Sequence, residues 1–128
     1  MPLDPISYSL YKRAVGALRL KIVDKGTFTP SGLGSEETVF ETSVKGKYAG
    51  YISVRNLQSG DEVTIYLYLK LLPDSPYELY DSATISGPAT ETIIPIYEVH
   101  VSYGLRVRLN QTAGTVRSYD YVIFKVQE

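Results

Sequence analysis

The sequence predicts an all-β protein, a single antiparallel β-sandwich of about eight strands preceded by a short N-terminal helix. Apolar and polar residues alternate with a period of two along most of the chain after residue 17, which is typical of strands with one buried face. Turn-forming residues interrupt this alternation about every ten residues. Most connections are too short for the crossover helices that a parallel sheet requires. We therefore expect an N-terminal arm at residues 1–16 and a sandwich domain at residues 17–128.

The N-terminal helix is predicted over residues 5–15. Asp4 can cap the free N–H groups of a first helical turn, and Pro5 is tolerated at the first helical position. Apolar side chains then recur every four residues, which places them on one face of a helix. These apolar positions are Ile6, Leu10 and Ala14.

The first strands follow this helix directly. Leu and Ile alternate with Arg and Lys in residues 18–22, whereas three Gly and one Pro make residues 26–35 a loop. The next predicted strand is at residues 38–44. Residues 46–47 are expected to form a tight hairpin turn into a strand at residues 48–55.

The strongest strand signal lies in residues 63–71, after a turn predicted at residues 56–61. Val, Ile and Leu occupy every second position of this strand, and Tyr66 and Tyr68 occupy its opposite face. Because a two-layer sandwich normally has one wet face on each sheet, a strand that is apolar on both sides is unusual.

Four more strands are expected after a break at residues 73–76. Pro95 interrupts one of them, which suits an edge strand or a bulge. Residues 112–115 are expected to turn the chain in a closing hairpin. The predicted strands are at residues 77–86, 92–101, 105–109 and 116–126.

Jelly-roll topology is the preferred arrangement of these strands, and an immunoglobulin-like sandwich is the second choice. Periodicity does not separate the two topologies, because both bury alternate residues of two packed sheets.

The composition excludes several classes of protein. Thirteen Lys and Arg against fourteen Asp and Glu give a formal net charge of −1, too little for a nucleic-acid coat or a polybasic membrane binder. The absence of Cys excludes a disulfide framework, a Cys-ligated zinc site and a thiol nucleophile. No apolar run has the length of a membrane helix or of a signal-peptide core. We expect neither a nucleic acid nor a membrane as partner.

Residues with catalytic or metal-binding chemistry lack the supporting parts that such sites need. His100 is the only His, without a nucleophile elbow or a second metal ligand, so a surface position is expected. The acidic pairs 36–37 and 61–62 lie beside predicted turns, where solvated charge is the ordinary explanation, and no calcium-loop spacing is present. Gly32 and Gly34 lie in a glycine-rich loop that has no following Lys. We expect no enzyme activity, catalytic residue, cofactor or metal site.

Tyrosine is the most informative residue type, because its twelve copies fall mostly in predicted strands. Two explanations stay open. Tyr rings can line outer sheet faces with their hydroxyls in water, or these faces can pack on another subunit, since interfaces are enriched in Tyr and Arg. Under the second explanation the N-terminal helix is a docking arm. The candidate contact residues are Ile6, Leu10, Tyr66, Tyr68, Arg106 and Arg108.

Three motifs in the second half of the chain support a resemblance to a known group. The first is NLQSGDEV at residues 56–63, and the second joins Tyr80, the Ser-Gly pair at residues 86–87 and Pro95. The third lies in residues 103–121 and contains the sharpest element, QTAGTVRS. Together they resemble small β-sandwich structural proteins of tailed bacteriophages and archaeal viruses, over about residues 48–126.

This resemblance implies a structural role in the virion, as a capsid decoration, turret, vertex or minor head protein made in the host cytoplasm. It implies a homo-oligomer, trimer or pentamer, and a major capsid protein as a further partner. The family offers no catalytic residues to transfer to this sequence.

A carbohydrate-binding β-sandwich module is the alternative. Tyr48, Tyr51 or Tyr77 would then be the platform on which a glycan ring stacks. Such platforms favour Trp, the widest flat ring, and the chain has no Trp.

Overall fold

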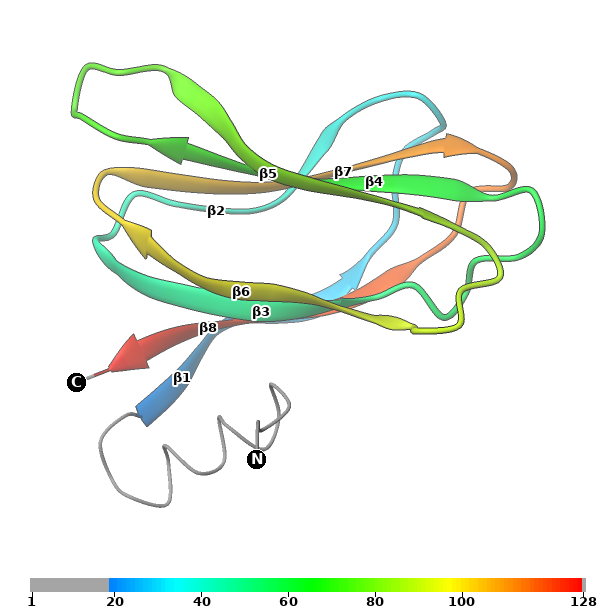
Figure 1. The fold of residues 1–128 in the computed structure, drawn as a ribbon, viewed down its shortest axis with the longest axis horizontal. Coiled ribbons are helices and arrows are strands. Elements are labelled where there is room, and N and C mark those ends of the chain that lie inside the picture. Colours follow the sequence, from blue (N-terminus) through cyan, green and yellow to red (C-terminus); the bar gives the residue numbers. More distant parts are fainter. Residues whose placement is uncertain (1–18, 128) are drawn as a thin grey trace, which may run out of the picture.

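The computed structural model describes residues 19–127, which form eight β-strands (Figure 1). The N-terminal arm at residues 1–16 and the helix predicted at residues 5–15 lie outside the described residues. Within the described part, no helix is long and apolar enough to cross a membrane. The strands are β1 (Arg19–Phe28), β2 (Glu37–Thr42), β3 (Gly46–Ser53), β4 (Glu62–Lys70), β5 (Tyr77–Ser86), β6 (Ile93–Val101), β7 (Gly104–Ala113) and β8 (Tyr119–Gln127).

The strands form two four-stranded sheets that face each other as two layers (Figure 1). One sheet has the order β1-β8-β3-β6 and the other has the order β2-β7-β4-β5. Every pairing is antiparallel. These features confirm the prediction of an all-β, antiparallel sandwich.

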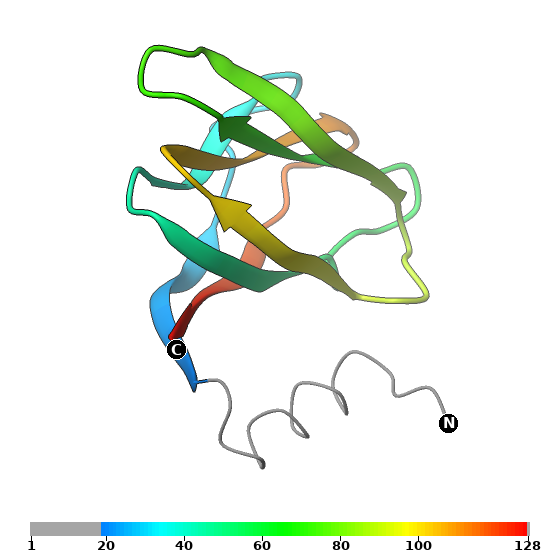
Figure 2. The same ribbon diagram turned by 60° about the vertical axis from the view of Figure 1, so that its left-hand side comes forward.

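The pairings are nested around the connection between β4 and β5. The pair β4·β5 is followed outward by β3·β6, β2·β7 and β1·β8. The outermost pair joins Arg19 to Gln127, and the start of β1 lies close to the chain's C-terminal end (Figure 2). The described chain is therefore a long antiparallel hairpin that is folded over into two layers.

Two predicted hairpins are wrong. Residues 46–47 are the start of β3, and the chain reverses before them, between β2 and β3, which belong to different sheets. Residues 112–115 cover the end of β7 and the start of its connection to β8, which lies in the other sheet. Only β4 and β5 are both consecutive and paired. The error has a physical reason: an alternating pattern shows which face of a strand is buried, but it does not show which strand is its neighbour.

The core lies between the two sheets and consists of alternate residues from their inner faces. Val63, Ile65 and Leu67 of β4 are buried, as the alternation predicts. Val54 and Leu57, in the connection from β3 to β4, close the end of the core. Other buried members are Tyr48, Ile52, Ile96, Val99, Val101, Leu105, Val107, Leu109, Tyr119 and Ile123.

Pro95 lies on β6, an edge strand whose pairing with β3 changes register between Tyr48 and Gly50. The sequence predicted an edge strand or a bulge at this proline, and the edge strand is confirmed. The bulge lies between Ile96 and Val99, while Pro95 pairs regularly with Tyr51. Because Pro has no N–H to donate to a neighbouring strand, it is tolerated on an edge strand, which has no neighbour on its outer side.

Candidate interaction surface

The outer face of the sheet β2-β7-β4-β5 brings four of the six candidate contact residues together. In the register of β4 and β7, Tyr66 lies opposite Arg108 and Tyr68 lies opposite Arg106. All four side chains are half-buried, and the buried residues between them face the core. We call these four residues the Tyr/Arg face. The other two candidates, Ile6 and Leu10, lie outside the described residues.

Arg106 is held on this face by a ring and a carboxylate. Its guanidinium carbon lies 3.9 Å from the centroid of the Tyr77 ring, within the range of a cation–π contact. Its Nε donates to Glu41 Oε1 over 2.6 Å. Because both members of this ion pair are about one-third to one-half exposed, the pair contributes more to orientation than to stability.

Arg108 is held in a similar way by Glu36. Its Nη2 donates to the Glu36 backbone carbonyl over 2.8 Å, and its Nε lies 3.5 Å from Glu36 Oε1. That Nε is buried and has no hydrogen-bond partner. Glu36 also accepts a hydrogen bond from the Tyr68 hydroxyl, which raises the pKa of Tyr68 above its ordinary value. The rings of Tyr66 and Tyr68 stack with their centroids 6.1 Å apart.

Each arginine of the Tyr/Arg face is therefore neutralised by a carboxylate from the region of β2. From the sequence alone, the acidic pair 36–37 was expected in solvent beside a turn, and no signal indicated this role of Glu36. The structure corrects that expectation for Glu36, which is partly buried against Arg108. The missing information was the pairing of β2 with β7, which no local pattern in the sequence contains.

A buried polar network lies where β4 begins and β7 ends. Asp61 is only 3% exposed, and its carboxylate accepts hydrogen bonds from Arg117 Nε at 2.6 Å, the Gln58 N–H at 2.7 Å and the Thr115 N–H at 3.0 Å. The expectation that Asp61 is a solvated turn residue is therefore wrong. Hydrogen bonds from Arg117 and Gln58 hold the pKa of Asp61 below its ordinary value of 3.8.

Gln111 is the second centre of this network and is fully buried. Its Nε2 donates to the carbonyls of Ala113 and Thr115 at 3.0 and 2.6 Å. Its Oε1 accepts from the Arg117 N–H at 2.9 Å and the Tyr119 hydroxyl at 2.8 Å. Burial of the phenol raises the pKa of Tyr119 to about 12.

The network joins two of the motifs that the sequence analysis singled out. Asp61 ends the NLQSGD turn, and its partners come from the QTAGTVRS segment. Chain segments about fifty residues apart are thereby joined at one end of the sandwich. The residues of these two motifs that take part in the network therefore have a structural role.

The network makes the stability of the fold depend on pH. Because the pKa of Asp61 lies below 3.8, its carboxylate stabilises the fold above that pH and this contribution is lost as the pH falls below it. We expect D61N to be less stable than the wild type at about pH 7, and the two proteins to converge towards about pH 2. Urea unfolding midpoints measured across this range test the expectation. A difference between the two proteins that stays constant with pH would contradict it.

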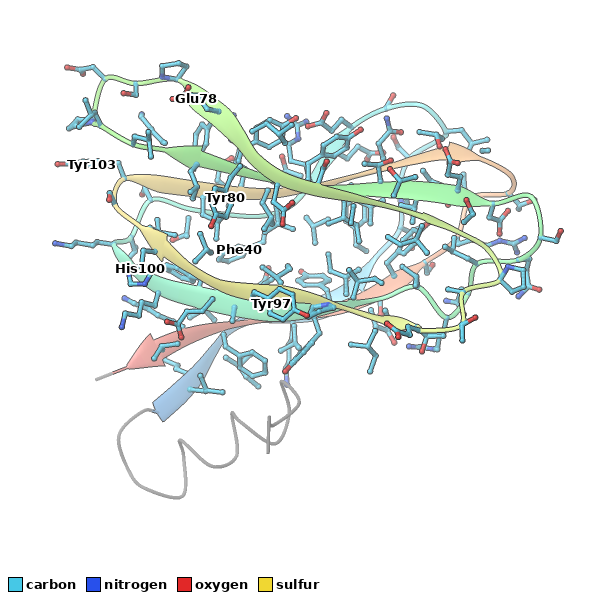
Figure 3. All side chains as sticks on the ribbon, viewed as in Figure 1. Phe40, Glu78, Tyr80, Tyr97, His100 and Tyr103 are labelled. Atoms are coloured by element: carbon cyan, nitrogen blue, oxygen red, sulfur yellow. The ribbon has the colours of Figure 1, made fainter. Side chains whose placement is uncertain are left out.

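His100 is exposed on the edge strand β6, opposite Lys47 of β3 (Figure 3). This agrees with the surface position expected for it. Among residues 19–127, no group of three or more His, Cys, Asp or Glu side chains is arranged to hold a metal ion.

An open pocket of about 300 Å³ lies at the other end of the core, where Phe40 sits between the sheets (Figure 3). Its walls are mainly apolar and include two lysines and no acidic residue. The lining residues are Lys21, Val23, Phe40, Thr42, Val44, Tyr48 and Lys125.

The three tyrosines of the carbohydrate-binding alternative do not form a platform. Tyr48 is 2% exposed and donates its hydroxyl to the Val44 carbonyl, so no sugar can stack on it. Tyr77 already carries Arg106 on one face of its ring. Tyr51 belongs to the other sheet, on strand β3. The geometry therefore gives the alternative no specific support.

The chain matches no protein-family model and no curated protein sequence. Among solved structures it is similar to the infectious bursal disease virus VP2 subviral particle, with a TM-score of 0.50 and 14% identity. What the two share is a fold. The similarity covers 85% of this chain but only 32% of the other, so this chain spans about one-third of the length of its structural relative.

Proposed function

We propose that this protein is a non-enzymatic viral structural protein that assembles through its Tyr/Arg face. The observation that favours this function is the Tyr/Arg face itself, which lies on the two middle strands of a sheet whose sandwich fold is also found in a viral particle protein. Aromatic and Arg side chains dominate the energetics of protein interfaces. Since the arginines are already neutralised by Glu36 and Glu41, such a face suits a partner without strong charge.

The strand order supports a jelly roll as the finer description of the fold. Nested pairing of the first strand with the eighth, the second with the seventh and so on is what two interleaved Greek keys produce, with strands divided between two sheets. An immunoglobulin-like sandwich instead pairs several consecutive strands within a sheet, and only β4 and β5 do so here. Jelly rolls are frequent in viral capsids.

The proposal extends to the assembly and its location. The chain would form a symmetric oligomer, a trimer or pentamer, and would contact a major capsid protein in the virion after synthesis in the host cytoplasm. Decoration, turret, vertex and minor head positions on tailed-phage or archaeal-virus particles all suit a domain of this size. The near-zero net charge of −1 agrees with partners that are protein subunits.

A charge placed in the centre of the Tyr/Arg face tests the proposal. Tyr66 makes no side-chain hydrogen bond in the described structure and is half-buried, so Y66D should leave the fold intact and weaken assembly at least about thirty-fold. Sedimentation velocity over a range of protein concentrations measures the oligomer, and S59D in an exposed turn is the matched control. A wild-type protein that stays monomeric, or an oligomer equally strong in Y66D, would overturn the proposal.

A further inference from the structure

The outer face of the other sheet, β1-β8-β3-β6, is apolar across its centre. Two rows of side chains cross it: Ile22, Phe124 and Ala49 lie side by side, and so do Val122, Tyr51 and Pro95. They face away from the core, because Gly50, Ile52 and Ile123 between them are buried against the opposite sheet. Figure 3 shows side chains that project from this outer side, below the sheet in that view. We call these six residues the apolar face.

The six residues of the apolar face carry no charge, unlike the Tyr/Arg face, and Lys25 of β1 borders the second row opposite Val122. Ile22 is 50% exposed, and the rings of Tyr51 and Phe124 pack edge to face with centroids 6.1 Å apart. Val126 lies beside this face, between Leu20 and Lys47, and is only 7% exposed although it is not part of the core cluster. A contiguous apolar surface of this kind on the wet side of a sheet indicates a covering partner.

The segment before β1 is suited to be that cover. Residues 1–18 lead directly into β1, which is an edge strand of this sheet, and Leu20 already points to the outer side opposite Val126. The predicted helix at residues 5–15 would be about 16 Å long, and four strands span about 14 Å from first to last. The helix, with Ile6, Leu10 and Ala14 along one side, would thus cross the sheet from one edge towards the other.

We propose that residues 5–15 pack as an amphipathic helix across the apolar face of their own chain, with Ile6 and Leu10 against Tyr51, Ala49 and Phe124. The inference does not rest on the proposed viral function. It gives Ile6 and Leu10 a partner within the chain in place of the contact between subunits that the sequence suggested. The Tyr/Arg face on the opposite sheet then remains free for assembly.

Because the chain has no Cys, introduced thiols report on this contact without interference. In the double variant L10C/A49C, a short bis-maleimide should join the two residues within one chain, giving a band at the mass of a single chain and a joined pair of tryptic peptides. The matched control is L10C/S82C, in which Ser82 lies opposite Tyr66 on the outer side of the other sheet. No cross-link, a cross-link only between chains, or equal cross-linking in the control would overturn the proposal.

Thiol reactivity gives a second readout that needs no exact geometry. In the single variant A49C, the thiol should react with a soluble maleimide at least about tenfold more slowly than in S82C. The added substitution L10D should remove this protection while the thermal unfolding transition remains cooperative. An A49C thiol that reacts as fast as S82C would show that the face is uncovered and would contradict the proposal.

Discussion

Replacing Gln111 with Leu is expected to lower the free energy of unfolding by about 3–5 kcal/mol. The two side chains are similar in size, so the substitution removes hydrogen bonds without opening a large cavity. It leaves the Tyr119 hydroxyl, the Arg117 N–H and two carbonyls without their partner inside a region where Gln111 is fully buried. A buried polar group that loses its partner costs about 1–3 kcal/mol; the Tyr119 hydroxyl is buried and the other three groups are partly buried, so their combined loss exceeds the gain from an added apolar side chain.

Urea unfolding at equilibrium measures this effect. Y119F removes one of the four hydrogen bonds and should cost about 1–2 kcal/mol. T112V, at the exposed neighbouring position, loses only the exposed hydrogen bond from Thr112 to Glu62 and should change stability by no more than about 1 kcal/mol. A Q111L protein within about 1 kcal/mol of the wild type would show that the network does not stabilise the fold.

The second large effect is expected at Gly114, where G114A should cost about 3–4 kcal/mol. Two physical causes add. The φ angle of Gly114 is +89°, a region that L residues rarely adopt. A Cβ at this position would also overlap the Asp61 carboxylate and lie 2.7 Å from the Asp61 Cα. The new methyl group therefore displaces the acceptor that binds Arg117 and Thr115.

Gly60 separates the two causes. Its φ angle is +91°, almost the same as that of Gly114, but a Cβ there would meet no atom within 4 Å. G60A should therefore lower the free energy of unfolding by only about 1–2 kcal/mol, which is the effect of the positive φ angle alone. The difference between the two variants, measured by urea or thermal unfolding, reports the collision with Asp61. Equal losses in the two variants would contradict the role given to Asp61.

The faces of the strands could be predicted from the sequence, whereas their neighbours could not. The alternation in residues 63–71 correctly placed Val63, Ile65 and Leu67 in the core, with Tyr66 and Tyr68 on the opposite side. It did not distinguish a hairpin from a crossing between sheets, because both connections are short and both reverse the chain. The hairpins expected at residues 46–47 and 112–115 failed for this reason.

The candidate site could be predicted only in part, because a sequence pattern does not show which strands are neighbours. Tyr66, Tyr68, Arg106 and Arg108, which were chosen from their residue types, lie on one outer face. Asp61 was misassigned to solvent because its partner Arg117 is 56 residues away and is brought near only by the fold. The apolar face was missed although it left a signal: Val122, Ile123 and Phe124 are consecutive apolar residues, which breaks the alternation of a strand with one wet side.

The nested pairing also has a consequence for how the chain reaches its fold. Each sheet combines strands from the beginning, middle and end of the described chain, and in the sheet β1-β8-β3-β6 only β8 joins β1 to the pair β3·β6. On a ribosome, β1 would therefore have no paired neighbour until β8 has been made. Pairing between strands that are far apart in the chain costs loop-closure entropy before the stabilising contacts form. This cost slows folding to about milliseconds to seconds. The sandwich of residues 19–127 is therefore completed only when β8 joins β1 to β3.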